Sequence, residues 1–136
     1  MKPYLKALTA LVLGGLVGCS TGQPSLEEAQ AQVCQNLATF QQNIATLAAT
    51  SQNSTVGQFK EAQANVARSF TELKESVGIA RSIKIDELEQ AYQDLDRAVG
   101  QVSNDQTIQE AIASVQPAMQ NVQAASEQLR TGAACQ

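Results

Sequence analysis

The sequence predicts an all-α protein, an antiparallel up-down four-helix bundle. Apolar residues recur in alternating steps of three and four along four segments, which is the spacing of one buried stripe on an amphipathic helix. Short polar stretches separate these segments, and capping residues mark where most of them begin. The alternation of apolar and polar residues that is typical of a half-buried strand is almost absent.

The first two helices are predicted by their capping residues and their apolar stripes. Ser25 followed by Glu28 is a capping box, in which the side chains and backbone at a helix start bond reciprocally. Thr55 followed by Gln58 repeats this pattern after a polar break, and Gly78 is expected to end the second helix. The stripes comprise Leu26, Gln30, Val33, Leu37, Phe40, Ile44 and Leu47 in the first helix, and Val56, Phe59, Gln63, Val66, Phe70, Leu73 and Val77 in the second.

The third and fourth helices follow the same logic. Asp86, at the start of the third, suits the positive end of the helix dipole, and Thr107 with Glu110 can cap the fourth. We expect a kink at Pro117, because proline removes one backbone hydrogen bond and crowds the preceding turn. Gly132 is expected to end the fourth helix. The stripes comprise Ile85, Leu88, Tyr92, Leu95, Val99 and Val102, and Ile108, Ile112, Val115, Met119, Val122, Ser126 and Leu129.

The start of the chain has the layout of a secretory signal. Lys2 and Lys6 precede an apolar run over residues 7–16 that is too short to cross a bilayer as a helix. The run ends in four residues that resemble the lipobox of bacterial lipoproteins, namely a leucine, a small pair and a cysteine. This resemblance implies that the segment before Cys19 is removed and that lipid chains are attached to Cys19. The lipobox comprises Leu16, Val17, Gly18 and Cys19.

A short polar tether is expected to join the lipidated cysteine to the bundle. At about 3.3 Å per residue, its five residues after the cysteine reach at most about 16 Å, which keeps the bundle close to the membrane. The chain then divides into a signal peptide over 1–18, a lipidated tether over 19–24, a four-helix bundle over 25–131 and a C-terminal tail over 132–136.

Two further cysteines remain once the lipid occupies the first one. Cys34 lies early in the first helix and Cys135 lies in the C-terminal tail. Because exported chains seldom keep free thiols, the sequence favours a disulfide over two unpaired cysteines. The up-down topology supports this pairing, since it places the start of the first helix beside the end of the fourth.

Charge and composition disfavour several classes of function. Without Lys2 and Lys6 the chain keeps seven basic and thirteen acidic residues, which argues against nucleic acid as a partner. The chain has no histidine, which removes His-based catalytic triads and the Glu-x-x-His ligands of di-iron bundles. We expect no enzyme activity, catalytic residue, cofactor or metal. An acidic face of the third helix is interpreted as solvated, with a weak cation site as the alternative; it comprises Asp86, Glu89, Gln93 and Asp96.

The connection between the second and third helices is expected to lie at the same end of the bundle as the tether. Ile79 and Ile83 could dip into a bilayer there, while Arg81 and Lys84 contact anionic headgroups. The alternative is that the isoleucines close the end of the bundle and the two charges are solvated. These four residues are the candidate membrane contact.

The lipobox and the four-helix plan together resemble the lipidated PsbQ-like subunits of cyanobacterial photosystem II. The resemblance covers the architecture and assigns no site residue. We expect a lipid-anchored, non-catalytic structural or interaction module, an accessory subunit of a membrane or envelope complex with a protein partner. Its expected location is the periplasmic or luminal side of a bacterial outer, inner or thylakoid membrane.

Two alternatives stay open at this level. One is a lipoprotein that binds a small apolar molecule in a cavity lined by Phe59, Phe70, Tyr92 and Met119. The aromatic residues fall on the core stripes, however, and we interpret them as packing residues. The other is a structural envelope lipoprotein of the murein-lipoprotein kind, although those are continuous coiled coils with a terminal lysine.

Overall fold

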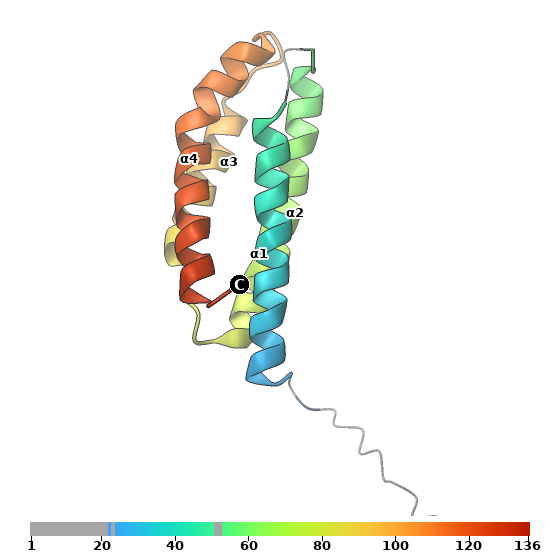
Figure 1. The fold of residues 1–136 in the computed structure, drawn as a ribbon. Coiled ribbons are helices and arrows are strands. Elements are labelled where there is room, and N and C mark those ends of the chain that lie inside the picture. The colour runs from blue at the N-terminus through green and yellow to red at the C-terminus, as the bar shows by residue number, and fades with distance from the viewer. Residues whose placement is uncertain (1–21, 23, 51–52) are drawn as a thin grey trace, which may run out of the picture.

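The computed structural model describes residues 22, 24–50 and 53–136. Within them the chain forms four α-helices and no strand (Figure 1), which confirms the predicted all-α four-helix bundle. The helices are α1 (Leu26–Ala48), α2 (Val56–Ala80), α3 (Asp86–Gly100) and α4 (Ile108–Gly132).

The bundle consists of two antiparallel helical hairpins lying side by side. Helices α1 and α2 form one hairpin, α3 and α4 form the other, and α1 also packs against α4. One end, which we call the tether end, holds the start of α1, the connection from α2 to α3 and the end of α4 (Figure 1). The opposite end, where α1 joins α2 and α3 joins α4, is called the far end.

Three of the four helices begin with the capping boxes that the sequence predicts. In each box the side-chain oxygen of the capping residue accepts from a backbone N–H three residues later, and the later side chain accepts from the capping N–H. Such a cap stabilises a helix by about 1 kcal/mol. The pairs are Ser25 with Glu28, Thr55 with Gln58, and Thr107 with Glu110. Helix α3 begins after Ile85 without a side-chain cap.

The predicted stripes form the core with few exceptions. Ten of the largest side chains, from α1, α2 and α3, are almost fully buried. The clearest difference is Leu26, which is 76 % exposed, while Ala29 is the first buried residue of α1. Figure 1 shows the reason, because the first turn of α1 extends past the end of α4. These ten are Phe40, Phe59, Leu37, Ile44, Leu47, Leu73, Leu88, Leu95, Val33 and Val66.

An aromatic cluster joins the two hairpins near the middle of α2. The Phe70 ring stacks on Tyr92 of α3 with the ring centroids 4.0 Å apart, and it also contacts Phe40 of α1 at 5.7 Å. Burial raises the pKa of the Tyr92 hydroxyl above its usual value, and the negative charge of Asp96 raises it further. The stacked and tilted rings stabilise the contact between the two hairpins.

One helix end differs from the glycine signals in the sequence. Gly78 lies inside α2, which continues to Ala80, whereas α4 ends at the predicted glycine, Gly132. The left-handed backbone conformation occurs instead at Arg81 and Ala134, both with φ of 51°. Packing explains the longer α2, because its last residue, Ala80, is 3 % exposed and is part of the hydrophobic core. Ala133, which follows α4, is buried in the same core at 2 % exposure.

Helix α4 continues without a break through Pro117, whose side chain is exposed. Figure 1 shows α4 curving in its first half, in the region that contains this proline. A proline removes one hydrogen bond from a helix, so a local bend is the expected response.

Candidate functional site at the tether end

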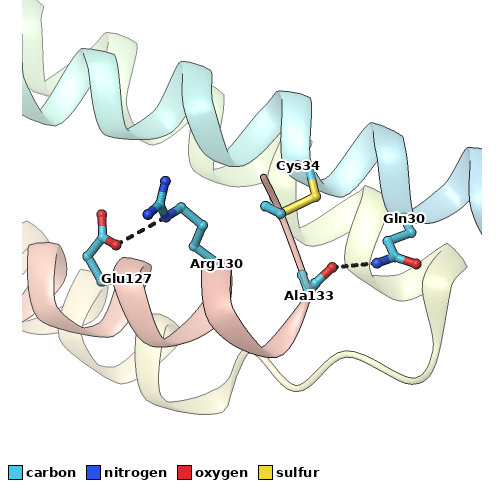
Figure 2. The surroundings of a disulfide bond; sticks show 6 residues. Gln30, Cys34, Glu127, Arg130 and Ala133 are labelled. Atoms are coloured by element: carbon cyan, nitrogen blue, oxygen red, sulfur yellow. Dashed lines mark hydrogen bonds and ion pairs between the residues drawn. A yellow bond between two sulfur atoms is a disulfide. The ribbon is translucent and has the colours of Figure 1, made fainter.

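A disulfide fastens the C-terminal tail to α1 at the tether end (Figure 2). The sulfur atoms of Cys34 and Cys135 are bonded, with the two Cα atoms 5.4 Å apart. Nearby, the Gln30 side-chain N–H donates to the backbone carbonyl of Ala133 at 2.6 Å. The predicted pairing is therefore present, and it joins residues 101 positions apart in the sequence.

The chain turns back toward α1 through a Schellman motif at the end of α4. The N–H of Cys135 donates to the carbonyl of Arg130 at 3.0 Å, and the N–H of Ala134 donates to that of Thr131 at 3.1 Å. Between these bonds Ala134 adopts the left-handed conformation, which an alanine enters at a cost of about 1 kcal/mol. This turn is what brings the cysteine within reach of its partner.

The last turn of α2 and the α2–α3 connection carry the four residues predicted to contact a membrane. Ile79 is 53 % exposed, and Arg81 and Lys84 are also exposed. Ile83 differs, because it is partly buried and packs against the hydrophobic core. The sequence allows two interpretations of the isoleucines. Ile83 fits the one in which they close the end of the bundle, whereas the exposed Ile79 can contact another surface.

Leu26 is a residue of this site that the sequence analysis missed. It was assigned to the buried stripe, yet it is the most exposed large hydrophobic side chain of the described residues. Its position next to the capping residue Ser25 was a usable signal, because the first turn of a terminal helix often lacks a neighbour. Leu26 and Ile79 are the two exposed large hydrophobic residues in the described part of the chain.

Two surface grooves border this end of the bundle. One, of about 360 Å³, lies between the start of α1, the connection and the end of α4. The other, of about 460 Å³, lies between the connection and the facing parts of α3 and α4. Both grooves are lined by Ser82, Ile83 and Gly132. The first groove is bordered by Leu26, Gln30, Ala80, Ser82, Ile83 and Gly132.

Charges of both signs surround the site. Arg81 and Lys84 are exposed, and neither forms an ion pair with a residue that the structure describes. Besides Glu89, which pairs with Lys74, four carboxylates lie in the first turns of α1 and α3, where the positive end of each helix dipole stabilises them. These carboxylates are Glu27 and Glu28 in α1, and Asp86 and Glu87 in α3.

The sequence also offers two other groups of candidate residues, the acidic face of α3 and the lining of an apolar cavity. On the acidic face of α3, the Glu89 carboxylate pairs with the Lys74 ammonium at 2.6 Å. Within residues 22, 24–50 and 53–136, no group of three or more His, Cys, Asp or Glu side chains is placed to hold a metal ion. The four residues expected to line an apolar cavity are each buried or partly buried. They are Phe59, Phe70, Tyr92 and Met119.

The predicted lipidation site falls outside the described residues. That applies to the signal peptide over 1–18 and to the lipobox residues Leu16, Val17, Gly18 and Cys19. Among the helices that the structure describes, none combines the length and apolar character needed to cross a membrane.

Comparison with known protein families, with curated protein sequences and with solved structures found no significant match.

Proposed function

We propose that this protein is a lipid-anchored helical bundle that acts as a non-catalytic structural or protein-interaction module at the surface of a bacterial membrane. The proposal is carried by the lipobox, Leu16 to Cys19, which stands shortly before the first capping residue, Ser25. Six residues of extended chain span at most about 20 Å, so a lipid on Cys19 would hold the tether end close to the bilayer. Three acyl chains would make this attachment essentially permanent.

The disulfide supports an exported location. Disulfides form and persist in oxidising compartments such as the periplasm, and they are rare in the cytosol. The bond between Cys34 and Cys135 closes a loop of about one hundred residues, for which chain entropy predicts a stabilisation of about 4 to 5 kcal/mol. This stabilisation suits a rigid module that must stay folded outside the reducing interior of the cell.

The surface supports a role in protein contact. Glutamines recur on the exposed faces of α1 and α4, where they provide hydrogen-bonding groups without charge. A partner can cover such a face without removing water from many charged groups, which is costly. A shallow groove of about 220 Å³ on this side is lined mainly by Ala48, Met119 and three glutamines of α4. The partner would be a protein of the same membrane or envelope compartment.

Membrane fractionation with mass analysis tests the anchor. The wild-type protein is expected in the membrane fraction, cleaved before Cys19 and heavier by its acyl chains. A Cys19→Ser variant is expected to lose the acyl mass and to leave the membrane fraction. A matched control, Ser20→Ala, changes the neighbouring residue and should behave as the wild type. The anchor proposal is wrong if the Cys19→Ser protein is processed and retained as before.

Crosslinking in native membranes, followed by mass spectrometry, tests the interaction role. We expect crosslinks from surface lysines to one recurrent protein, and these should vanish when Cys19 is replaced. Crosslinks that are spread over abundant membrane proteins without preference would contradict a dedicated partner.

The apolar-ligand alternative is the weaker proposal. Phe59 is fully buried, and the Phe70 ring is already stacked on Tyr92 with a centroid distance of 4.0 Å. Rings packed on each other leave their faces unavailable to a ligand. Organic extraction of the purified protein followed by mass analysis would support this alternative if a stoichiometric small molecule were recovered.

A further inference from the structure

We propose that the tether end rests directly on the bilayer, with Leu26 and Ile79 inserted among the lipid headgroups and the helices standing away from the membrane. This inference rests on the proposed anchoring at Cys19, and it adds a contact surface and an orientation.

The first argument is the uneven distribution of exposed apolar residues. Leu26 is 76 % exposed and Ile79 is 53 % exposed, and both lie at the tether end. At the far end, the large apolar residues nearest the helix connections are each less than a tenth exposed. Single exposed apolar residues are common on proteins, so the informative feature is that both lie where the tether leaves. The covered residues of the far end are Val56, Val102 and Ile108.

The second argument is the length of chain that precedes the site. Leu26 follows Cys19 by seven residues, which span at most about 25 Å when extended. With lipid on the cysteine, the bilayer is the surface that this end meets at the highest local concentration, because tethering makes the encounter intramolecular. A second protein would have to displace the bilayer from this position.

The charges indicate what kind of lipid contact to expect. Arg81 and Lys84 can each contact a phosphate, but four carboxylates of α1 and α3 lie at the same end. Because the carboxylates offset the two cations, anionic lipid should strengthen the contact little. Insertion of the two apolar side chains into the boundary between headgroups and acyl chains is then the main attraction.

Single-tryptophan reporters test the orientation. The chain contains no tryptophan, so each variant carries one reporter in the full-length, membrane-processed protein. Leu26→Trp and Ile79→Trp report on the tether end, Gln42→Trp reports on the exposed side of α1, and Asp105→Trp reports on the far end. All four positions are exposed, so each variant should fold. The purified proteins are placed in phosphatidylcholine vesicles whose acyl chains carry bromine, a short-range quencher.

The expected result is a roughly two-fold loss of fluorescence at positions 26 and 79, with little loss at 42 and 105, because residues in the boundary region lie within reach of the chains. Helix α1 is about 35 Å long, so a far-end reporter stands well clear of the quencher. Replacing part of the lipid by phosphatidylglycerol should leave the pattern unchanged.

Three results would overturn the inference, and they differ from one another. Equal, weak quenching at all four positions in membrane-bound protein means that the tether end does not contact the bilayer, while the anchor stands. Strong quenching at position 42 means that the bundle lies on its side. If mass analysis of the same samples shows no acyl chains and the protein leaves the vesicles, the proposed anchoring fails and the contact fails with it.

Discussion

Gln63 occupies a position where a polar side chain should cost stability. It lies on the buried stripe of α2, between the fully buried Phe59 and Val66, and is itself 6 % exposed. Neither its Nε2 nor its Oε1 has a hydrogen-bond partner among the described residues. A buried amide without partners costs about 1 to 3 kcal/mol by mutational measures. We predict that Gln63→Met stabilises the bundle by about that amount.

Methionine suits this test because it changes little besides the polar group. It is unbranched and close to glutamine in length, and the two have similar helix propensities. Gln42→Met, at an exposed position of α1, is the matched control, and a surface change of this kind should stay within about 0.5 kcal/mol. Urea unfolding of the chain from residue 20 onward, followed by circular dichroism, measures both. With a urea slope of about 2 kcal/mol per molar, a gain of about 2 kcal/mol moves the midpoint up by about 1 M.

The reasoning is refuted if Gln63→Met lowers the free energy of unfolding by more than about 1 kcal/mol while the control is neutral, because losing a satisfied buried hydrogen bond costs about this much. Such a loss would mean that the amide is satisfied, by a buried water or by a bound molecule between the hairpins. If the partner is a bound molecule, the result supports the apolar-ligand alternative, with Gln63 as a polar contact.

Three other predictions use the same unfolding assay or a simple titration. Ala134→Gly should raise the free energy of unfolding by up to about 1 kcal/mol, since glycine adopts φ of 51° without strain; no gain would mean that the turn is not left-handed. Reducing the Cys34–Cys135 bond should lower the free energy of unfolding by about 4 kcal/mol. An unchanged urea midpoint after reduction would contradict the cross-link. Tyr92 is the sole tyrosine after the predicted signal, and its absorbance should titrate at higher pH in folded than in urea-unfolded protein. The neutral Tyr92 side chain contributes its full stabilisation below the pKa that it has in the unfolded chain, and this contribution is lost as the pH rises through the raised pKa of the folded state. Asp96→Asn should lower the pKa of the folded state. Identical titration curves for folded and unfolded protein would contradict the burial argument.

Much of the fold could be predicted because its signals are local. A capping box needs only two residues three positions apart, as with Thr55 and Gln58, and a stripe needs only a helical period. The sequence favours the pairing of Cys34 with Cys135 because exported chains seldom keep free thiols, and the predicted up-down topology supports it by placing both at one end. The caps and stripes depend only on the order of residues along each helix, whereas the support for the disulfide also needs the predicted topology.

The candidate site was predicted only in part. Ile79, Arg81 and Lys84 are exposed, as the membrane-contact interpretation requires, whereas Ile83 packs on the core. Leu26, which the predicted stripe places in the core, is exposed. The helical period predicts which face of a helix is buried, but it does not predict which turns along the axis a neighbouring helix covers. A stripe residue is buried only where a neighbouring helix reaches it, and α1 extends past α4 at its first turn.

The sequence by itself determined the helices, their capped starts, their buried faces and the expectation of a lipid anchor, because each depends on neighbouring residues or a short motif. Tertiary structure decided where α2 ends, that Gly78 does not end it, and which apolar residues face outward. The physical reason is that burial of Ala80 in the core outweighs the local preference of α2 to end at Gly78. Such a balance depends on distant segments meeting, which no local pattern records.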